Sequence, residues 1–388
     1  MKTKKQVKYR DIFDLVRLPV TFIGRFQPVI LTRPTGPMPI QTSTTAAPPL
    51  PMLVTGIAGV PGYNAFHYFR SLYGDQVIGV RQASMWPLSG DGIVPCEVEN
   101  SDEVKQLWDR YQFKSLLNCA GSCRLKSCEL DPAMAHRVNV TGTENMIAQA
   151  TRYDAAVIHL SIDLVFAGRD GGHYDEDDEP DPVTIYGSKM VLAEQIVRNE
   201  RPDASILRIS LPMGISFNGH AGAVDWIASR FKQEKPATLY FDEVRTPTYS
   251  DCMNRLFAKL FATPLPGTFH AGGPRRLSLY EIAQIVSVVG GYDPQLLQGC
   301  ARIEAGPMPP RAGNVTMNSA KLSAALGYQP FDAWPADGDL VPTERDWHLE
   351  EASRFDGSAK AVHRLLYCNP INPGLVPPSR EEIWNGRF

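Results

Sequence analysis

Residues 52–62, Met-Leu-Val-Thr-Gly-Ile-Ala-Gly-Val-Pro-Gly, contain the feature that decides the fold. The apolar residues at its start predict a short buried strand over 52–55. Gly56, Gly59 and Gly62 follow at the spacing G-x-x-G-x-x-G, and the residues after them predict a helix. A strand, a glycine turn and a helix form a phosphate cradle, because the glycines admit a pyrophosphate to the backbone and the helix N-terminus offers free N–H groups. The stretch therefore predicts nucleotide binding.

Strands and helices alternate after this turn as far as residue 210. The predicted strands are 52–55, 76–80, a short third strand ending near 95, 115–118, 155–161 and 205–209, and the predicted helices are 62–73, 102–111, 131–150 and 186–199. Strands that alternate with helices of this length form βαβ units, which build a parallel sheet covered on both faces. The fold class is therefore predicted to be α/β, a Rossmann-type doubly wound parallel sheet with a smaller C-terminal lobe.

Composition narrows the class of protein. The chain has 388 residues, of which 43% are hydrophobic and 21% charged, as in ordinary globular proteins. Its net charge of −3 gives no reason to expect a nucleic acid or a membrane as partner. No apolar run reaches the roughly 18–20 residues of a membrane-spanning helix. Seven cysteines, an odd number without a common zinc spacing, predict neither a disulfide framework nor a metal site. We therefore expect a cytoplasmic protein.

Four segments are expected along the chain. Residues 1–51 carry eight Lys or Arg and two Asp, with many prolines, and predict a basic disordered arm. A targeting peptide, or translation that begins at Met52, stays open for this segment. Residues 52–210 form the predicted dinucleotide-binding domain, 211–340 a smaller lobe interleaved with it, and 341–388 a C-terminal extension of unknown purpose.

The ends of the second and third strands are predicted to meet the adenosine part of the cofactor. An Asp or Glu commonly ends the second strand of an NAD-binding domain and holds the ribose diol, but this chain has Arg81 there. A cation suits the 2′-phosphate of NADP, so NADP is favoured over NAD, although a solvated strand-end arginine is the alternative. Glu97 is predicted to accept a hydrogen bond from the adenine amino group, or else to be a solvated acid.

Small residues follow the fourth strand and would let the middle of the cofactor lie against the sheet edge. The predicted cofactor-binding residues from these four strand ends are Gly56, Ile57, Ala58, Gly59, Val60, Gly62, Arg81, Glu97, Asn118, Cys119, Ala120 and Gly121. Two further polar residues are expected inside the fold. Asn139 lies within a predicted helix, where its low propensity suggests a buried hydrogen-bonding role. His159 lies on an apolar strand and is predicted to be a core histidine.

Two later stretches carry a family resemblance. They read Ser161-Ile-Asp-Leu-Val-Phe-Ala-Gly168 and Tyr186-Gly-Ser-Lys-Met190, with Tyr174-Asp-Glu-Asp-Asp-Glu-Pro180 between them. They resemble the extended short-chain dehydrogenase/reductases, most closely the dTDP-4-dehydrorhamnose reductase branch, with Ser-Thr-Asp-Tyr-Val-Phe-x-Gly, Tyr-x-Glu-x-Asp-x-Pro and Tyr-Gly-x-x-Lys. Arg245-Thr-Pro-Thr-Tyr-Ser-Asp251 resembles the substrate-side turn of that branch, and the resemblance covers about 52–335.

The resemblance implies a hydride transfer from a nicotinamide cofactor to a sugar ketone. In that family a Tyr hydroxyl supplies the proton, a Lys four residues later lowers the Tyr pKa and holds the nicotinamide ribose, and a Ser or Thr polarises the carbonyl. Such help is needed because a free phenol has a pKa of about 10. The resemblance thus makes Tyr186 the expected proton donor and a cofactor contact, and makes the lobe over 211–340 the expected site for a sugar nucleotide.

This sequence departs from the family pattern at two of the three catalytic positions. Ile162 stands at the hydroxyl position and Met190 at the lysine position. Lys189 comes one residue early, so it is rotated by roughly 100° off the Tyr186 face of the helix. Residues three apart also meet on a helix, and a lysine stem is long. We therefore expect Lys189 either to turn inward, assist Tyr186 and contact the cofactor, or to be a solvated lysine on the helix surface. Ser161 points to the opposite side from Ile162 and supplies a hydroxyl only if the strand has ended there.

Three residues are predicted on the substrate side. Besides Ser161, Asp163 is expected near the substrate with its carboxylate on nearby backbone groups. Arg245 faces the diphosphate of a sugar nucleotide, or else forms a structural salt bridge. The acidic run 175–181 predicts a solvated loop near the mouth of the site.

The predicted function is an NADP-preferring reductase of a nucleotide-activated 4-keto-6-deoxy sugar. A second hypothesis is a cofactor-binding regulatory or scaffold protein, as the methionine adenosyltransferase regulatory β subunit is for this fold, and it is motivated by Ile162 and Met190. A third is an epimerase or dehydratase, which returns the hydride and retains its cofactor. The sequence leaves a homodimer open.

Overall fold

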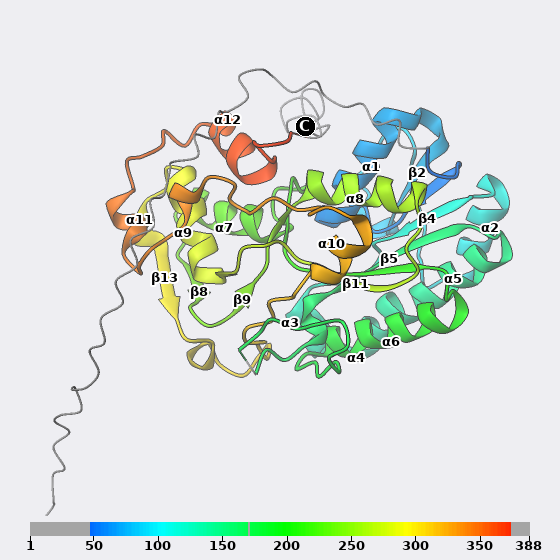
Figure 1. The fold of residues 1–388 in the computed structure, drawn as a ribbon, viewed down its shortest axis with the longest axis horizontal. Coiled ribbons are helices and arrows are strands. Elements are labelled where there is room, and N and C mark those ends of the chain that lie inside the picture. The colour runs from blue at the N-terminus through cyan, green and yellow to red at the C-terminus, as the bar shows by residue number, and fades with distance from the viewer. Residues whose placement is uncertain (1–46, 170, 374–388) are drawn as a thin grey trace, which may run out of the picture. The chain divides into compact units, whose positions relative to one another are not determined.

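The structure is a computed structural model that describes residues 47–169 and 171–373 (Figure 1). The basic arm predicted over 1–51 lies outside the described residues up to residue 46, as do residues 374–388 of the C-terminal extension.

Seven parallel strands form the central sheet in the order β3-β2-β1-β4-β5-β6-β11. They are β1 (Met52–Val54), β2 (Val77–Arg81), β3 (Ile93–Pro95), β4 (Ser115–Asn118), β5 (Ala156–Ile162), β6 (Ser205–Ile209) and β11 (Gly267–Ala271). The strand order reverses direction between β1 and β4, which creates a crevice at the carboxyl ends of these two strands. The prediction of a Rossmann-type doubly wound sheet is confirmed.

Helices cover both faces of this sheet, as Figure 1 shows. The first layer contains α1 (Val60–Tyr73) and α8 (Ser250–Ala262), and the second contains α2 (Ser101–Tyr111), α5 (Gly142–Arg152) and α6 (Ile185–Glu200). In β1, Met52 and Val54 pack into the core of the first layer and Leu53 packs into that of the second. A strand buried on both faces needs this continuous apolar run, because successive side chains point to opposite faces.

The helix predicted over 131–150 is interrupted. It consists of α4 (Pro132–His136), a π-helical turn (Arg137–Thr141) and α5. Asn139 lies in the widened turn, where its Nδ2 donates to the carbonyl of Ala135 at 2.9 Å and its Oδ1 accepts from the N–H of Ser122 at 2.8 Å. The buried hydrogen-bonding role predicted for Asn139 is therefore confirmed, and π-helical turns of this kind often occur near functional sites.

The C-terminal half interleaves with the first. Its short strands pair as β8 (Ala237–Tyr240) with β13 (Leu297–Cys300), β9 (Val244–Arg245) with β12 (Leu277–Ser278), and β7 (Pro212–Met213) with β10 (Thr248–Tyr249), and its helices are α7 (Ala223–Lys232), α9 (Leu279–Val289) and α10 (Ala320–Leu326). Strand β11 nevertheless returns to the edge of the central sheet. The extension after residue 340 contains α11 (Trp347–Glu350) and α12 (Ala359–Val362), and its Leu365 and Leu366 pack into the same core as α1 and α8.

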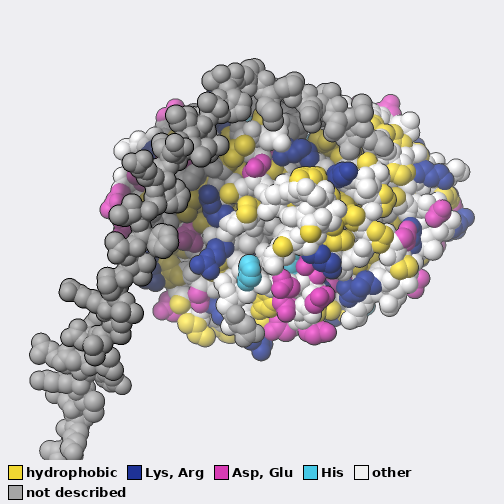
Figure 2. All heavy atoms as spheres, viewed as in Figure 1, with side chains coloured by type: hydrophobic (Ala, Val, Ile, Leu, Met, Phe, Trp, Pro, Cys, Tyr) yellow, Lys and Arg dark blue, Asp and Glu magenta, His cyan; other side chains and the backbone are white. Residues whose placement is uncertain are grey.

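Within residues 47–169 and 171–373, no helix is both long and apolar enough to cross a membrane. On the face shown in Figure 2, basic side chains are interspersed with acidic ones, and acidic side chains gather near the lower centre.

Candidate functional site

The glycine turn after β1 has two tightly packed glycines and one open one. A Cβ atom on Gly56, whose φ is 64°, would lie 2.1 Å from the carbonyl oxygen of Cys119, and one on Gly62 would lie 2.4 Å from the carbonyl oxygen of Gly56. A Cβ on Gly59 would meet nothing closer than 3.4 Å. Gly56 and Gly62 are therefore required by packing, whereas Gly59, the N-cap of α1, leaves room for a group outside the chain. A pyrophosphate fits this arrangement, because α1 also presents its free N–H groups there.

A buried hydrogen-bond network connects the residue before this turn to the end of β4. The Thr55 hydroxyl donates to Oδ1 of Asn118 at 2.8 Å and accepts from the backbone N–H groups of Cys119 and Ala120, each at 3.0 Å. Nδ2 of Asn118 lies 3.0 Å from Nδ1 of His159. Burial lowers the pKa of His159 to about 4, so its ring is neutral at physiological pH. Asn118 thus shapes the crevice through the turn that follows it, and His159 is the core histidine that the sequence predicted.

Arg81 at the end of β2 and Glu97 just after β3 both bind the turn that follows β2. Nη1 of Arg81 donates to the carbonyls of Gln82 and Ala83 at 2.9 and 3.2 Å, and Glu97 accepts from the N–H of Ala83 at 2.7 Å. Nε of Arg81 is buried and has no partner within the described part of the chain. Trp86, which follows this turn, is 73% exposed. Arg81 and Glu97, the two residues predicted to contact the adenosine, therefore hold this turn in place. Nε of Arg81 remains an unpaired donor among the described residues.

Tyr186 lies at the start of α6 in an apolar cluster. Met190, one helical turn later, is buried beside it, and Ile162 packs against the same cluster with Leu164 and Val315. Burial raises the pKa of Tyr186 well above its ordinary value, and the nearby thiol of Cys123 raises it further. Lys189, by contrast, is only half-buried. It forms no hydrogen bond or ion pair with the described residues, and Arg245 is the cation that opposes the rise of the Tyr186 pKa.

The prediction that Ser161 acts on substrate is corrected by its placement. Strand β5 continues through Ile162, so Ser161 does not leave the strand where the prediction required it to. Its hydroxyl donates to Glu194 on α6 at 2.5 Å. Glu194 is fully buried and forms a two-pronged ion pair with Arg208 at 2.9 Å for both contacts, while Arg198 binds it at 3.0 Å. Although burial alone would raise its pKa, the hydrogen bonds from Arg208 lower the pKa of Glu194.

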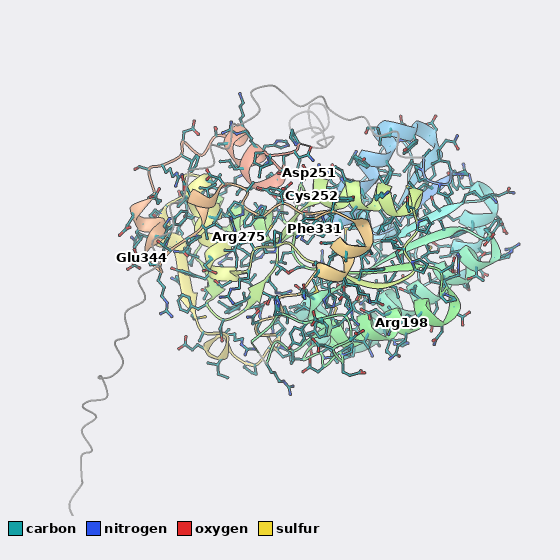
Figure 3. The ribbon with its side chains drawn as sticks, in the orientation of Figure 1. Arg198, Asp251, Cys252, Arg275, Phe331 and Glu344 are labelled. Carbon is teal, nitrogen blue, oxygen red and sulfur yellow. The ribbon has the colours of Figure 1, made fainter. Side chains whose placement is uncertain are left out.

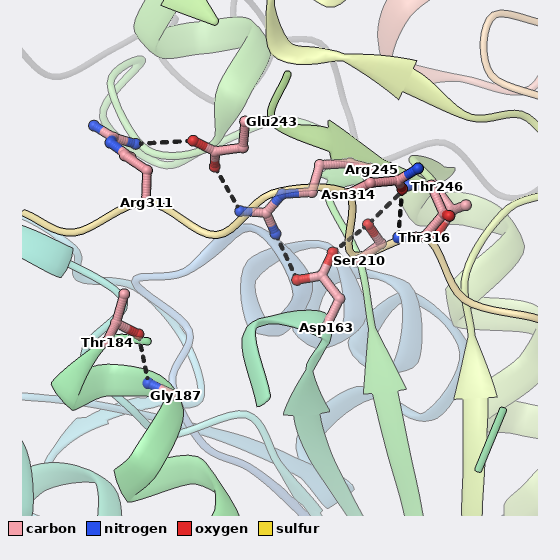
Figure 4. A network of polar contacts seen from close by, with 10 residues as sticks. All are labelled: Asp163, Thr184, Gly187, Ser210, Glu243, Arg245, Thr246, Arg311, Asn314 and Thr316. Atoms are coloured by element: carbon pink, nitrogen blue, oxygen red, sulfur yellow. Dashed lines mark hydrogen bonds and ion pairs between the residues drawn. The ribbon is translucent and has the colours of Figure 1, made fainter. Parts of the chain in front are cut away.

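Asp163 and Arg245 meet at the carboxyl end of β5 (Figure 4). Arg245 donates to Asp163 at 2.5 Å and to Glu243 at 2.8 Å, and the Ser210 hydroxyl donates to the other oxygen of Asp163 at 2.6 Å. Asp163 therefore binds side chains rather than the nearby backbone that the sequence predicted. Burial alone would lower the pKa of Arg245, but the carboxylates of Asp163 and Glu243 raise it, so the guanidinium stays charged. Nε of Arg245 has no partner in the part of the chain that the structure describes.

The acidic run 175–181 is a mostly exposed loop, as predicted, and three of its carboxylates bind other segments. Glu176 accepts from the backbone N–H of His270 at 2.8 Å, and Asp181 accepts from that of Ala167 at 2.7 Å. Asp175 binds the Asn318 amide at 2.8 Å. These carboxylates therefore fasten the segment to the carboxyl edge of the sheet.

Two residues that organise the site were missed from the sequence. Thr55 directly precedes the first glycine, and its polarity at the end of an apolar strand was the available signal. Glu194 was noticed only for its spacing from Tyr186, whereas the structure makes it the centre of a buried ion-pair network that reaches Arg198 on the exposed side of α6 (Figure 3).

Several curated proteins are similar to this chain along most of its length. A probable low-salt glycan biosynthesis reductase from Haloferax volcanii is 26% identical over 276 residues, which are 71% of this chain and 91% of that protein. A dTDP-4-dehydrorhamnose reductase from Mycolicibacterium smegmatis is 28% identical over 244 residues, covering 62% and 72%. Methionine adenosyltransferase 2 subunit beta from Rattus norvegicus is 26% identical over 245 residues, covering 60% and 70%.

Solved structures share the fold. A dTDP-4-dehydrorhamnose reductase from Bacillus anthracis, in complex with NADP, superposes with a TM-score of 0.61 at 20% identity and covers 78% of this chain and 97% of its own. A UDP-glucose 4-epimerase from Thermus thermophilus, in complex with NAD, gives a TM-score of 0.62 at 20% identity and covers 76% and 98%.

The family model described as the RmlD substrate binding domain matches residues 51–337. This range includes the glycine turn, Tyr186 and the Arg245 network, and it ends before the C-terminal extension. Its members include NAD(P)-dependent dTDP-4-dehydrorhamnose reductases, as the resemblance implied. The chain therefore belongs to the RmlD-like sugar-nucleotide reductase family of the extended short-chain dehydrogenase/reductases.

Proposed function

We propose that this protein binds a nicotinamide dinucleotide in the crevice between β1 and β4 and reduces a nucleotide-activated 4-keto-6-deoxy sugar. The observation that carries the proposal is the glycine turn: Gly56 and Gly62 are closed by packing, while Gly59 is open. When bound, the reduced cofactor would supply the hydride. The residues that would hold it are Gly59 with the N-terminus of α1, the turn after Asn118, and the turn after β2.

A preference for NADP is supported by the end of β2. Arg81 replaces the acid that would bind a ribose diol, and its guanidinium places a positive charge at this end of the crevice. Glu97 lies on the neighbouring strand end, where its carboxylate already holds the N–H of Ala83. We expect NADPH to bind more tightly than NADH for this reason.

Tyr186 is proposed as the proton donor. Because burial raises its pKa, the hydroxyl stays protonated at neutral pH and can donate to a substrate carbonyl. The same raised pKa makes it a weak acid, and Met190 gives no charge to assist it. The proposed reduction is therefore slow compared with that of an enzyme that has a lysine at this position, unless Lys189 turns inward when substrate binds.

A second function is supported by the apolar packing around Tyr186. Ile162 and Met190 occupy the two positions where the family pattern has a hydroxyl and a lysine, and both contribute to one hydrophobic cluster. A chain that keeps the cofactor crevice and fills the catalytic positions with apolar groups suits a cofactor-binding regulatory protein. The similarity to methionine adenosyltransferase 2 subunit beta supports the same alternative.

The two functions are separated by binding and turnover measured on the same preparation. NADPH and NADH are titrated by fluorescence quenching, and oxidation of NADPH is then followed with dTDP-4-keto-6-deoxyglucose and with other nucleotide-activated keto sugars. Binding with oxidation supports the reductase. Binding without oxidation across these sugars contradicts the reductase and favours the regulatory protein.

A double variant sharpens this comparison. If the apolar positions limit the chemistry, Met190→Lys combined with Ile162→Thr should raise the rate of NADPH oxidation above that of the parent. Tyr186→Phe in the double variant is the matched control, because it removes the proposed proton donor and should abolish the gain. A gain that survives Tyr186→Phe would contradict the role proposed for Tyr186.

A further inference from the structure

The C-terminal extension is fixed inside the fold by contacts with distant segments. Leu365 and Leu366 are buried, and their carbonyls accept from the Tyr249 hydroxyl at 3.1 Å and from the Trp334 indole N–H at 3.0 Å. The backbone N–H of Asn369 donates to Asp251 on α8 at 3.0 Å, and Figure 3 labels this carboxylate beside Cys252. Leu365, Leu366 and Asn369 all lie beyond residue 337, where the match to the family model ends.

Tyr367 of this extension contacts a buried carboxylate. Its hydroxyl donates to Oδ1 of Asp225, near the start of α7, at 2.6 Å. The other oxygen of Asp225 accepts from the backbone N–H of Ser216 at 3.0 Å and from the Ser216 hydroxyl at 2.5 Å. Asp225 is only 2% exposed, so hydrogen bonds from these donors take the place of bonds that water would provide to an exposed carboxylate.

The segment 214–222, which includes Ser216, lies against the glycine turn. Asn64 on α1 donates from the same Nδ2 to the carbonyl of Ile215 and to that of Val60, both at 2.8 Å. A Cβ on Gly222 would lie 2.7 Å from Cγ2 of Val60, the residue that follows Gly59. The segment thus contacts α1 at Val60 and Asn64, and Asp225 binds the segment through Ser216.

We propose that Tyr367 is a positioning residue of the dinucleotide site. It holds Asp225, Asp225 holds the segment 214–222, and this segment fixes the glycine turn that receives the pyrophosphate. The C-terminal extension is then a working part of the cofactor site rather than an appendage outside the family domain. The inference rests on the proposed function insofar as the ligand of the turn is a nicotinamide dinucleotide.

Tyr367→Phe tests this proposal. The variant keeps the ring and removes the Tyr367 hydroxyl, which donates to the buried carboxylate of Asp225. We expect the segment 214–222 to become more mobile when this hydrogen bond is removed. We expect the Kd for NADPH to rise about fivefold, and Ser216→Ala, which removes a donor from the same carboxylate, should have a similar effect. Both variants act through Asp225. The Kd for NADPH of the double variant should therefore rise no more than about tenfold, which is less than the product of the two single effects.

Tyr280→Phe is the matched control. The Tyr280 hydroxyl donates to the carbonyl of Arg345, in the same extension, at 3.1 Å, but it has no contact with Asp225 or Ser216 among the interactions described. Its Kd for NADPH should equal that of the parent. Equal affinity in the parent and a folded Tyr367→Phe variant overturns the inference, as does an equal loss in Tyr280→Phe.

Hydrogen exchange on the unmodified protein provides a measurement that does not depend on a folded variant. Saturating NADPH should slow exchange in the segment 214–222 and also in residues 365–369. Slowing at the glycine turn alone overturns the inference and leaves the proposed function intact. A parent that does not bind NADPH by titration overturns the proposed function and this inference together.

Discussion

Gly59→Ala should separate the ligand-binding role of the glycine turn from its structural role. Gly59 has φ −89° and ψ 159°, a conformation that alanine adopts without strain, and the added methyl would meet no atom within 3.4 Å. Alanine is a poorer N-cap than glycine. It also lowers the entropy of the unfolded chain, which stabilises the folded protein by about 0.4–1 kcal/mol. The free energy of unfolding should therefore change by less than about 1 kcal/mol.

Binding should respond much more strongly than stability. The methyl would occupy the side of the turn that is open for a pyrophosphate, and it would cost at least one hydrogen bond to a charged group, or about 2 kcal/mol. This loss corresponds to an increase of roughly 30-fold in the Kd for NADPH. The measurement is a fluorescence titration of NADPH into parent and variant, accompanied by urea unfolding of both.

Gly56→Ala provides the contrasting variant. A left-handed conformation costs a non-glycine residue about 1–2 kcal/mol, and the new Cβ would lie 2.1 Å from a backbone oxygen that cannot move aside easily. We expect a loss of at least about 3 kcal/mol in the free energy of unfolding. If the Gly59→Ala protein binds NADPH as tightly as the parent, the dinucleotide does not bind at this turn.

Three further predictions concern the buried polar groups. Burial lowers the pKa of His159 and of His270 from 6.5 to about 4, so the stability that their neutral rings contribute is present above pH 6.5 and is lost as the pH falls towards 4. Urea unfolding at about pH 5 should show a loss of about 2 kcal/mol per histidine in the free energy of unfolding relative to neutral pH. No loss would contradict these assignments. Glu194→Gln leaves Arg208 buried without its counter-charge and should lower the free energy of unfolding by about 3 kcal/mol. Asp242→Asn, which removes the carboxylate that pairs with the surface residue Arg302, is the control and should lower it by less than about 1 kcal/mol in the same assay. Tyr186→Phe should abolish NADPH oxidation while the variant still binds NADPH, and retained turnover would exclude Tyr186 as proton donor.

Features set by local sequence were predicted well. The glycine spacing and the alternation of short apolar strands with helices depend on neighbouring residues only, and they were sufficient for the Rossmann-type sheet. Asn139 was also predicted correctly as a buried hydrogen-bonding residue, because an asparagine inside a helix has a cost that its surroundings must offset. The π-helical turn around it was not predicted, and neither was the hydrogen bond that Asn139 accepts there from the backbone N–H of Ser122.

Features set by distant contacts were not accessible from the sequence. Arg81 and Glu97 were assigned to the cofactor by strand position, and nothing in the sequence revealed that both hold the backbone at Ala83. Ser161 required knowledge of where β5 ends. Tyr367 and Asp225 are 142 residues apart and belong to no shared motif, so their contact appears only in the folded chain.

The most direct test of the account is a single titration of NADPH into the purified protein, followed in the same cuvette by a nucleotide-activated 4-keto-6-deoxy sugar. We expect saturable NADPH binding and then a slow, sugar-dependent fall in the absorbance of the reduced nicotinamide. Saturable binding with no fall would contradict the reductase and favour a regulatory protein. An absence of binding would contradict the assignment of the crevice at Gly59 itself.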